Sequence, residues 1–195
     1  MNAVQTSRAA TEAIVPADLP AIASVAIRAA TPDDAPAIHA LVMTNLESGH
    51  LLPRTLDDLV LHAHRFLVLD AGDEVIGCGE LAPLSRTVAE IRSLVVDARQ
   101  RGLGLGSRLV DALKQRARLD GYATLCAFTH QPVSFVRQGF SIVPHVWLPE
   151  KISTDCHACP LFRRCGQYAM WFAVRQGAAR PARVVPRRSS PVVRA

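Results

Sequence analysis

The chain has 195 residues, 49% of them hydrophobic, which suffices for one domain with a packed core and leaves length for tails. Its formal net charge of +5 is unevenly distributed, because residues 175–195 contain six arginines and no acidic residue. Without those six, 16 of the 22 basic residues remain against 17 acidic ones, so the rest of the chain is nearly neutral. A nucleic-acid-binding core is therefore not supported.

The sequence shows no membrane-directing segment. No run approaches the roughly 20 apolar residues that span a bilayer. Glu12 and Asp18 lie where a secretory signal would have an apolar region. We therefore expect a cytoplasmic protein, whose five cysteines are thiols or metal ligands rather than disulfides.

The first half of the chain predicts short strands and helices that lead into an antiparallel hairpin. Thr31, followed by a proline and two aspartates, is a strong helix start, since threonine caps a helix and acids suit its positive end. Thr55 starts a second, shorter helix that ends near residue 64. Two apolar runs joined around a glycine indicate the hairpin. The strands expected here lie at 25–28, 66–69 and 75–81.

The second half alternates strands with helices, as α/β proteins do. A long strand at 88–96 leads through a glycine-rich turn into an amphipathic helix that runs from Gly104 to about residue 119. Gly121 suits the left-handed position just after that helix. The elements expected next are a strand at 125–128, a short helix at 132–138 and a strand at 140–147. An early hairpin and late alternation together predict a mixed sheet.

The turn Arg101-Gly-Leu-Gly-Leu-Gly106 joins the long strand to its helix. Glycines let the backbone approach a ligand, and the first turn of a helix offers unpaired N–H groups that suit a phosphate or pyrophosphate. The turn lacks the Lys-Ser/Thr ending of a P-loop and the glycine spacing of a dinucleotide fingerprint. A plain strand-to-helix turn is the alternative interpretation.

This turn resembles the acetyl-CoA-binding motif of the GNAT acetyltransferases, Arg/Gln-x-x-Gly-x-Gly/Ala. Ala89-Glu-Ile91 before it and Gly139-Phe140 after it also fall where that family has them, and the similarity covers about residues 26–148. The resemblance implies acetyl-CoA as co-substrate and a GNAT fold, which is an α/β fold whose mixed central sheet has splayed parallel strands and flanking helices. The cofactor-binding residues that it implies are Leu94, Val96, Arg101, Gly102, Gly104, Gly106 and Ser107.

Acetyl transfer to an amine needs a base, because an α-amine is mostly protonated at neutral pH. Glu90 is the first candidate, since it lies where histone acetyltransferases of this superfamily carry their catalytic glutamate. The alternative for Glu90 is an exposed strand residue paired with Arg92. Glu80, which follows a glycine on the preceding strand, is the second candidate base. Many family members protonate the departing thiolate with a tyrosine, but Phe135 and Val136 stand in its place, so the general acid stays open.

Three segments also resemble the acetyltransferase domain of N-acetylglutamate synthases, including their short stand-alone form. The segments are Gly49-x-Leu-Leu-Pro-Arg54-Thr, Ala89-Glu-Ile-Arg92-Ser-Leu94, and Leu148-Pro-Glu-Lys151 followed by Asp155-Cys-x-x-Cys-Pro-x-Phe-x-x-Cys165. The resemblance implies L-glutamate as acceptor, whose two carboxylates call for cations, arginine above all. Arg54, Arg92 and Lys151 are therefore the candidate substrate-binding residues. The alternative for Arg92 is a plain ion pair with Glu90, which faces the same side of the strand.

The remaining feature is the cluster Cys156, Cys159 and Cys165. Three thiolates with this spacing are compatible with a structural zinc site if His145 or His157 supplies a fourth ligand. Only one Cys-x-x-Cys pair is present, so a knuckle of reduced thiols is the alternative, and the identity of a metal stays open.

The sequence therefore predicts a GNAT domain at 25–174, with a Cys-rich segment at 152–166, between a disordered leader at 1–24 and a basic, Pro/Arg-rich disordered tail at 175–195. We expect an enzyme that acetylates the α-amine of L-glutamate, an entry step of arginine biosynthesis. The alternatives are acetylation of another small amine or of a protein N-terminus, and a non-catalytic acetyl-CoA-binding module that contacts nucleic acid. Small molecules are the expected partners, no membrane contact is expected, and a homodimer is compatible with the sequence.

Overall fold

The computed structural model describes residues 24–46, 51–72 and 74–174. The predicted tail and nearly all of the predicted leader thus lie outside the described residues. Seven strands of the described part form one sheet in the order β1-β2-β3-β4-β5-β7-β6. Its neighbouring strands are antiparallel except for β4 and β5, which are parallel. The predicted α/β class with a mixed sheet is confirmed.

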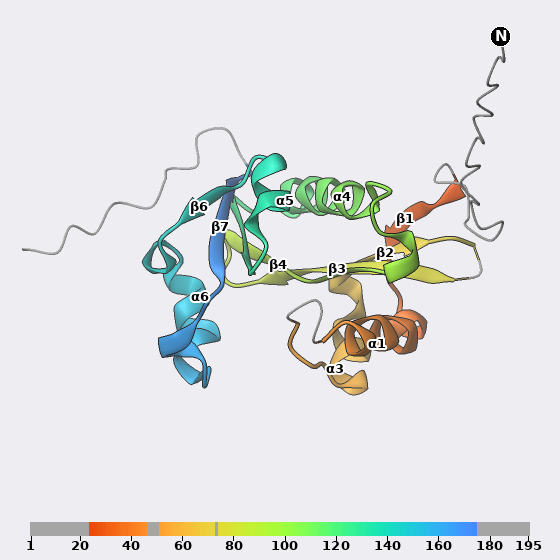
Figure 1. The fold of residues 1–195 in the computed structure, drawn as a ribbon, viewed down its shortest axis with the longest axis horizontal. Coiled ribbons are helices and arrows are strands. Elements are labelled where there is room, and N and C mark those ends of the chain that lie inside the picture. The colour runs from red at the N-terminus through yellow and green to blue at the C-terminus, as the bar shows by residue number, and fades with distance from the viewer. Residues whose placement is uncertain (1–23, 47–50, 73, 175–195) are drawn as a thin grey trace, which may run out of the picture.

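The strands are β1 (Ala26–Ala29), β2 (Phe66–Asp70), β3 (Val75–Pro83), β4 (Val88–Val96), β5 (Thr124–Thr129), β6 (Ser141–Val143) and β7 (Tyr168–Ala173). The α-helices are α1 (Ala35–Thr44), α3 (Leu56–His62), α4 (Leu105–Leu119), α5 (Pro132–Arg137) and α6 (Pro149–Thr154). Figure 1 shows α4 and α5 on one side of the sheet and α1, α3 and α6 on the other. Within the described ranges, no helix is long and apolar enough to cross a membrane.

Successive side chains of a strand point to opposite faces of the sheet, so the strands contribute to one hydrophobic core on each face. In β2, Leu67 and Leu69 belong to the cluster that α4 covers, whereas Phe66 and Val68 belong to the cluster under α1 and α3. Both faces of the central strands are therefore buried, and a ligand can enter the sheet only where two strands separate.

The parallel strands β4 and β5 separate midway. Their pairing ends at Ile91 and Ala127, although β4 continues to Val96 and β5 to Thr129. The second half of β4 therefore has no parallel neighbour. This is the splay that the family resemblance implied, and it positions the site described below.

The end of the chain departs from the prediction. The strand expected at 140–147 ends at Val143, because Pro144 follows and residues 145–147 form a 3-10 turn. The sequence analysis missed β7, which inserts between β5 and β6 and pairs with both. It also missed α6, which carries Lys151 and ends just before Asp155, two charged residues of the site.

The first helical segment begins at Thr31, as predicted. The backbone N–H of Thr31 donates to Oδ2 of Asp34 in a capping box, and both carboxylate oxygens of Asp34 accept hydrogen bonds from Arg28. Arg28 also donates to Asp70, which ends β2. The guanidinium thereby ties the helix start to the edge of the sheet.

We expect Asp34→Asn to lower the free energy of unfolding at pH 7 by about 2 kcal/mol. Hydrogen bonds from Arg28 hold the pKa of Asp34 at about 2, below its ordinary value of 3.8. This contribution is therefore complete above the ordinary pKa and is lost as the pH falls through the native one, where wild type and variant should converge. Denaturant unfolding over a pH series measures it, with Asp33→Asn, an exposed neighbour, as matched control. Equal stability of Asp34→Asn and wild type at pH 7 would contradict the assignment.

Candidate active site

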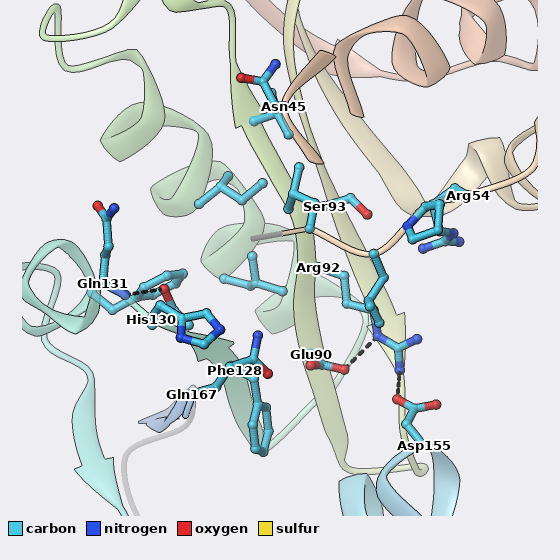
Figure 2. A pocket seen from close by; sticks show the side chains of 18 of the residues that line it. Asn45, Arg54, Glu90, Arg92, Ser93, Phe128, His130, Gln131, Asp155 and Gln167 are labelled. Carbon is cyan, nitrogen blue, oxygen red and sulfur yellow. Dashed lines mark hydrogen bonds and ion pairs between the residues drawn. The ribbon is translucent and has the colours of Figure 1, made fainter. Parts of the chain in front are cut away.

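A cavity of about 840 Å³ lies beside the unpaired half of β4. Its walls come from β4, the end of β5, the loop before α3, and α6. In Figure 2, Glu90 and Arg92 project from β4, with Arg54 above them and Asp155 below. The predicted site residues that line the cavity are Arg54, Glu90, Arg92, Leu94, Val96, Arg101 and Lys151.

A β-bulge in β4 determines on which face of the sheet the side chains of this strand lie. The register with β3 shifts after Arg92, so Ser93 and Leu94 lie opposite a single residue of that strand. Ser93 has a φ of 47°, an uncommon conformation for a residue other than glycine. Val95 consequently packs on the α1 side, while Leu94 and Val96 contact the α4 cluster. The bulge therefore makes Leu94 and Val96, which were predicted to bind the cofactor, face the opposite side of the sheet from Arg92, which was predicted to bind the acceptor.

Glu90 lies on the same face as Arg92, as alternation predicts. Its Oε2 accepts hydrogen bonds from Nε of Arg92 at 2.6 Å and from Nζ of Lys151 at 2.8 Å. Because Glu90 is only 3% exposed, the alternative of an exposed strand glutamate is wrong, although the pair with Arg92 that this alternative included is present. Glu90 is thus a buried carboxylate between two cations.

Asp155, which follows α6, closes this arrangement into a ring of four charges. Its Oδ2 accepts hydrogen bonds from Nη2 of Arg92 and from Nζ of Lys151, each at 2.8 Å. Burial by itself lowers the pKa of Arg92 and of Lys151, but the carboxylates of Glu90 and Asp155 outweigh it, so both pKa values are raised. Both side chains are therefore cations in the cavity wall.

Arg54 is also held by two carboxylates. Its Nη1 donates to Oε2 of Glu80 and its Nε to Oδ2 of Asp58, each at 2.7 Å. Burial by itself lowers the pKa of Arg54, but the carboxylates of Glu80 and Asp58 outweigh this effect, so the pKa of Arg54 is raised. Glu80 is 1% exposed and lies behind Arg54, outside the lining of the cavity. The structure thus separates the two candidate bases, because Glu90 reaches the cavity directly and Glu80 contacts it only through Arg54.

Arg101 lines the opposite end of the cavity. Its Nε donates to the carbonyl oxygen of Val96 at 3.1 Å, and its Nη2 donates to the side chain of Asn45. Asn45 is itself buried and donates to the carbonyl oxygen of Leu41 at the end of α1. These contacts hold the side chain of Arg101, the first residue of the predicted motif, beside the start of the glycine-rich turn.

The glycines of the motif leave open space beside this end. Gly102 and Gly104 have φ values of 80° and 77°, and a Cβ built on either would meet no atom within 4 Å. Gly106 and Ser107 lie in the first turn of α4, where a Cβ on Gly106 would lie 3.7 Å from Val96. An uncrowded turn at the positive end of a 15-residue helix suits a pyrophosphate, so the residues present fit the predicted co-substrate.

The five cysteines are free thiols. Cys78 and Cys126 are buried, and burial raises the pKa of the Cys78 thiol to about 12. Among the residues that the structure describes, no group of three or more His, Cys, Asp or Glu side chains is arranged to hold a metal ion. The zinc interpretation of the cluster at 156–165 thus has no geometric support here.

The lining residues that the sequence analysis missed include Asn45, Asp58, Phe128 and Asp155. The ring of Phe128, at the end of β5, has its centre 5.3 Å from Nζ of Lys151, a cation–π distance. Asp155 belongs to one of the three resembling segments, which was the only signal for it. The others are ordinary residues at element ends, and only the tertiary structure brings them to the site.

Comparisons with known proteins agree with this geometry. The sequence model of the Acetyltransferase (GNAT) family matches residues 35–140. An uncharacterized N-acetyltransferase of Chlorobaculum tepidum is 32% identical over 148 residues, which are 76% of this chain and 96% of that protein. An amino-acid acetyltransferase of Mycobacterium tuberculosis is 35% identical over 118 residues, 59% of this chain and 67% of the relative. The crystal structure of N-acetylglutamate synthase from Neisseria gonorrhoeae, complexed with coenzyme A and N-acetyl-glutamate, has a TM-score of 0.69 at 27% identity and matches 78% of this chain but 35% of that one.

Proposed function

Because the chain belongs to the acetyltransferase (GNAT) family and is an acetyl-CoA-dependent N-acetyltransferase, we propose that its acceptor is the α-amine of L-glutamate. The similarity of the chain to amino-acid acetyltransferases and to an N-acetylglutamate synthase supports an amino acid as the acceptor. Such a reaction would place the protein in arginine biosynthesis.

One observation carries the choice of an acidic acceptor. Arg54 from the loop before α3, Arg92 from β4 and Lys151 from α6 converge on one cavity wall, next to the buried carboxylate of Glu90. Glutamate has two carboxylates that three cations can bind, and its ammonium group has a carboxylate partner in Glu90. The site thus has cations for the two carboxylates of the proposed acceptor, each of them already paired with a carboxylate of the protein, and a carboxylate for its ammonium group.

Acetyl-CoA supplies a thioester as the acetyl donor. Before the amine can attack, its ammonium group must lose a proton, and we assign this proton to Glu90, directly or through one water. Arg92 and Lys151 hold the Glu90 carboxylate in place through its Oε2. Glu80 does not contact the acceptor in this scheme; it accepts a hydrogen bond from Arg54 and so positions that side chain. Ser134, which also lines the cavity, is a candidate to donate a proton to the departing thiolate.

A second candidate is a neutral acceptor such as glutamine. All three cations already have carboxylate partners, namely Asp58, Glu80, Glu90 and Asp155. A neutral amide side chain would need no ion pair to be broken. The two candidates differ in how strongly the acceptor KM depends on Arg92.

We expect Arg92→Lys to raise the KM for glutamate about tenfold, with little change in the affinity for acetyl-CoA. Lysine keeps the charge, but it loses the planar group that now donates to Glu90 and Asp155 from two nitrogens. Steady-state kinetics with each substrate varied in turn measures the effect. Arg116→Lys, in an ion pair with Asp120 on α4, is the matched control. An unchanged glutamate KM in Arg92→Lys would mean that Arg92 is only the ion-pair partner of Glu90.

A further inference from the structure

The four charges at the lower end of the cavity alternate in sign around a closed ring. Arg92 and Lys151 each contact Glu90 and Asp155, at four distances between 2.6 and 2.8 Å. The ring has two cations and two carboxylates, so it is electrically neutral without an acceptor. A further carboxylate can still use the N–H donors that the ring leaves over, but it meets cations whose charge is already balanced, and it therefore competes with the two carboxylates already present.

The two carboxylates of the ring differ in how firmly they are held. The side chain of Glu90 is 4% exposed, and its backbone is fixed in the sheet between two paired strands. The side chain of Asp155 is 34% exposed and lies just after α6, a helix of six residues. Solvent reaches Asp155, and a partly exposed ion pair contributes little net free energy. Asp155 is the partner that can be displaced.

Asp155 presents a carboxylate to Arg92 and Lys151, the same chemical group as the side chain of an acidic acceptor. A single oxygen, Oδ2, accepts both hydrogen bonds from Arg92 and Lys151. A substrate carboxylate can accept the same two hydrogen bonds, whereas the side-chain amide of glutamine is a weaker acceptor without charge.

We propose that Asp155 is a specificity-determining residue, which competes with the acceptor carboxylate for Arg92 and Lys151 and so sets the preference between acidic and neutral amino acids. This inference rests on the proposed function, because it takes the cavity wall to be the acceptor site. Asp155 touches no reacting atom in this scheme. It regulates how much of the positive charge of the wall an acceptor can use.

Asp155→Asn tests the inference, because the amide keeps the shape of the side chain and removes its charge. We expect the KM for L-glutamate to fall about fivefold, the KM for L-glutamine to change less than about twofold, and the Kd for acetyl-CoA to stay at its wild-type value. Asp120→Asn is the matched control, because Asp120 also follows a helix, pairs with a cation four residues earlier and has a side chain that is 33% exposed. It should leave both acceptor KM values unchanged.

A binding measurement separates this inference from the proposed function. Glutarate is a dicarboxylate that has no amine and cannot be acetylated, so calorimetry with glutarate reports on the cations alone. Tighter glutarate binding by Asp155→Asn supports the inference even if the wild type proves to acetylate another amine. Unchanged or weaker glutarate binding, or a higher glutamate KM, overturns it and makes Asp155 an anchor for Arg92. If Asp155→Asn does not fold, Asp155→Ser is measured in its place against the same criteria.

Discussion

Replacing Glu90 with glutamine is expected to lower kcat for acetyl transfer by about 100-fold or more. Glutamine has nearly the same shape as glutamate, but it cannot accept the proton that the acceptor ammonium must lose. The loss should be smaller at high pH, where more of the amine is already free. The glutamate KM should change less than kcat, because the variant removes a counter-ion of Arg92 and Lys151, which favours carboxylate binding, and also removes the partner of the acceptor ammonium, which disfavours it. Steady-state kinetics over a pH series, with both substrates varied, measures these effects.

The control for this variant is Glu74→Gln, which removes an exposed carboxylate paired with Arg99 away from the cavity. It should leave kcat unchanged. If Glu90→Gln turned over at the wild-type rate, Glu90 would be only the counter-ion of Arg92 and Lys151, and water or another group would have to take the proton.

Replacing Gly106 with valine is expected to weaken acetyl-CoA binding at least about 100-fold in a protein that still folds. Gly106 lies in the first turn of α4, and a Cβ there would meet Val96 at an ordinary contact distance of 3.7 Å. The fold therefore has room for a Cβ at this position, whereas the branches of valine extend further, into the space where a pyrophosphate would approach the backbone. Calorimetric titration with acetyl-CoA measures the loss.

Gly106→Ala is the graded control, because the acetyl-CoA motif allows glycine or alanine at this position and alanine adds only the Cβ. It should retain most of the affinity. Gly104 is a poorer choice for the experiment, since its φ of 77° strains any other residue and would confound binding with folding. Wild-type affinity in folded Gly106→Val would contradict the assignment of the turn.

The parts of the fold that could be predicted are those whose signals are local. The hairpin of β2 and β3, the strand β4 and the capped, amphipathic helix α4 all lie close to their predicted bounds. β7 could not be predicted in this way, because it follows an irregular Cys-rich segment and gains its partners β5 and β6 only in the folded sheet. β6 was predicted too long because the strand pattern continues past Pro144.

In the candidate site, too, the features with a local signal could be predicted and those that depend on tertiary contacts could not. That Glu90 and Arg92 share a face follows from the period of a strand, and the structure shows the contact. The bulge at Ser93 has no such signal, since the residue with positive φ is not a glycine. Asp58 and Asp155 were not predicted either, because an aspartate that begins or follows a helix is common. Asp58 pairs with Arg54, four residues earlier, whereas Asp155 meets Arg92 only in the folded protein. The sequence therefore indicated the three cations and two of the carboxylates that pair with them, Glu80 and Glu90, and missed Asp58 and Asp155.

The most direct measurement is release of free coenzyme A from acetyl-CoA by the purified protein in the presence of each amino acid in turn, with the product identified by mass spectrometry. We expect L-glutamate to give the highest kcat/KM, L-glutamine to be used less well, and the product to be N-acetylglutamate. A higher kcat/KM with an amino acid that has no acidic side chain, or no release above hydrolysis with any of them, would contradict the proposed function.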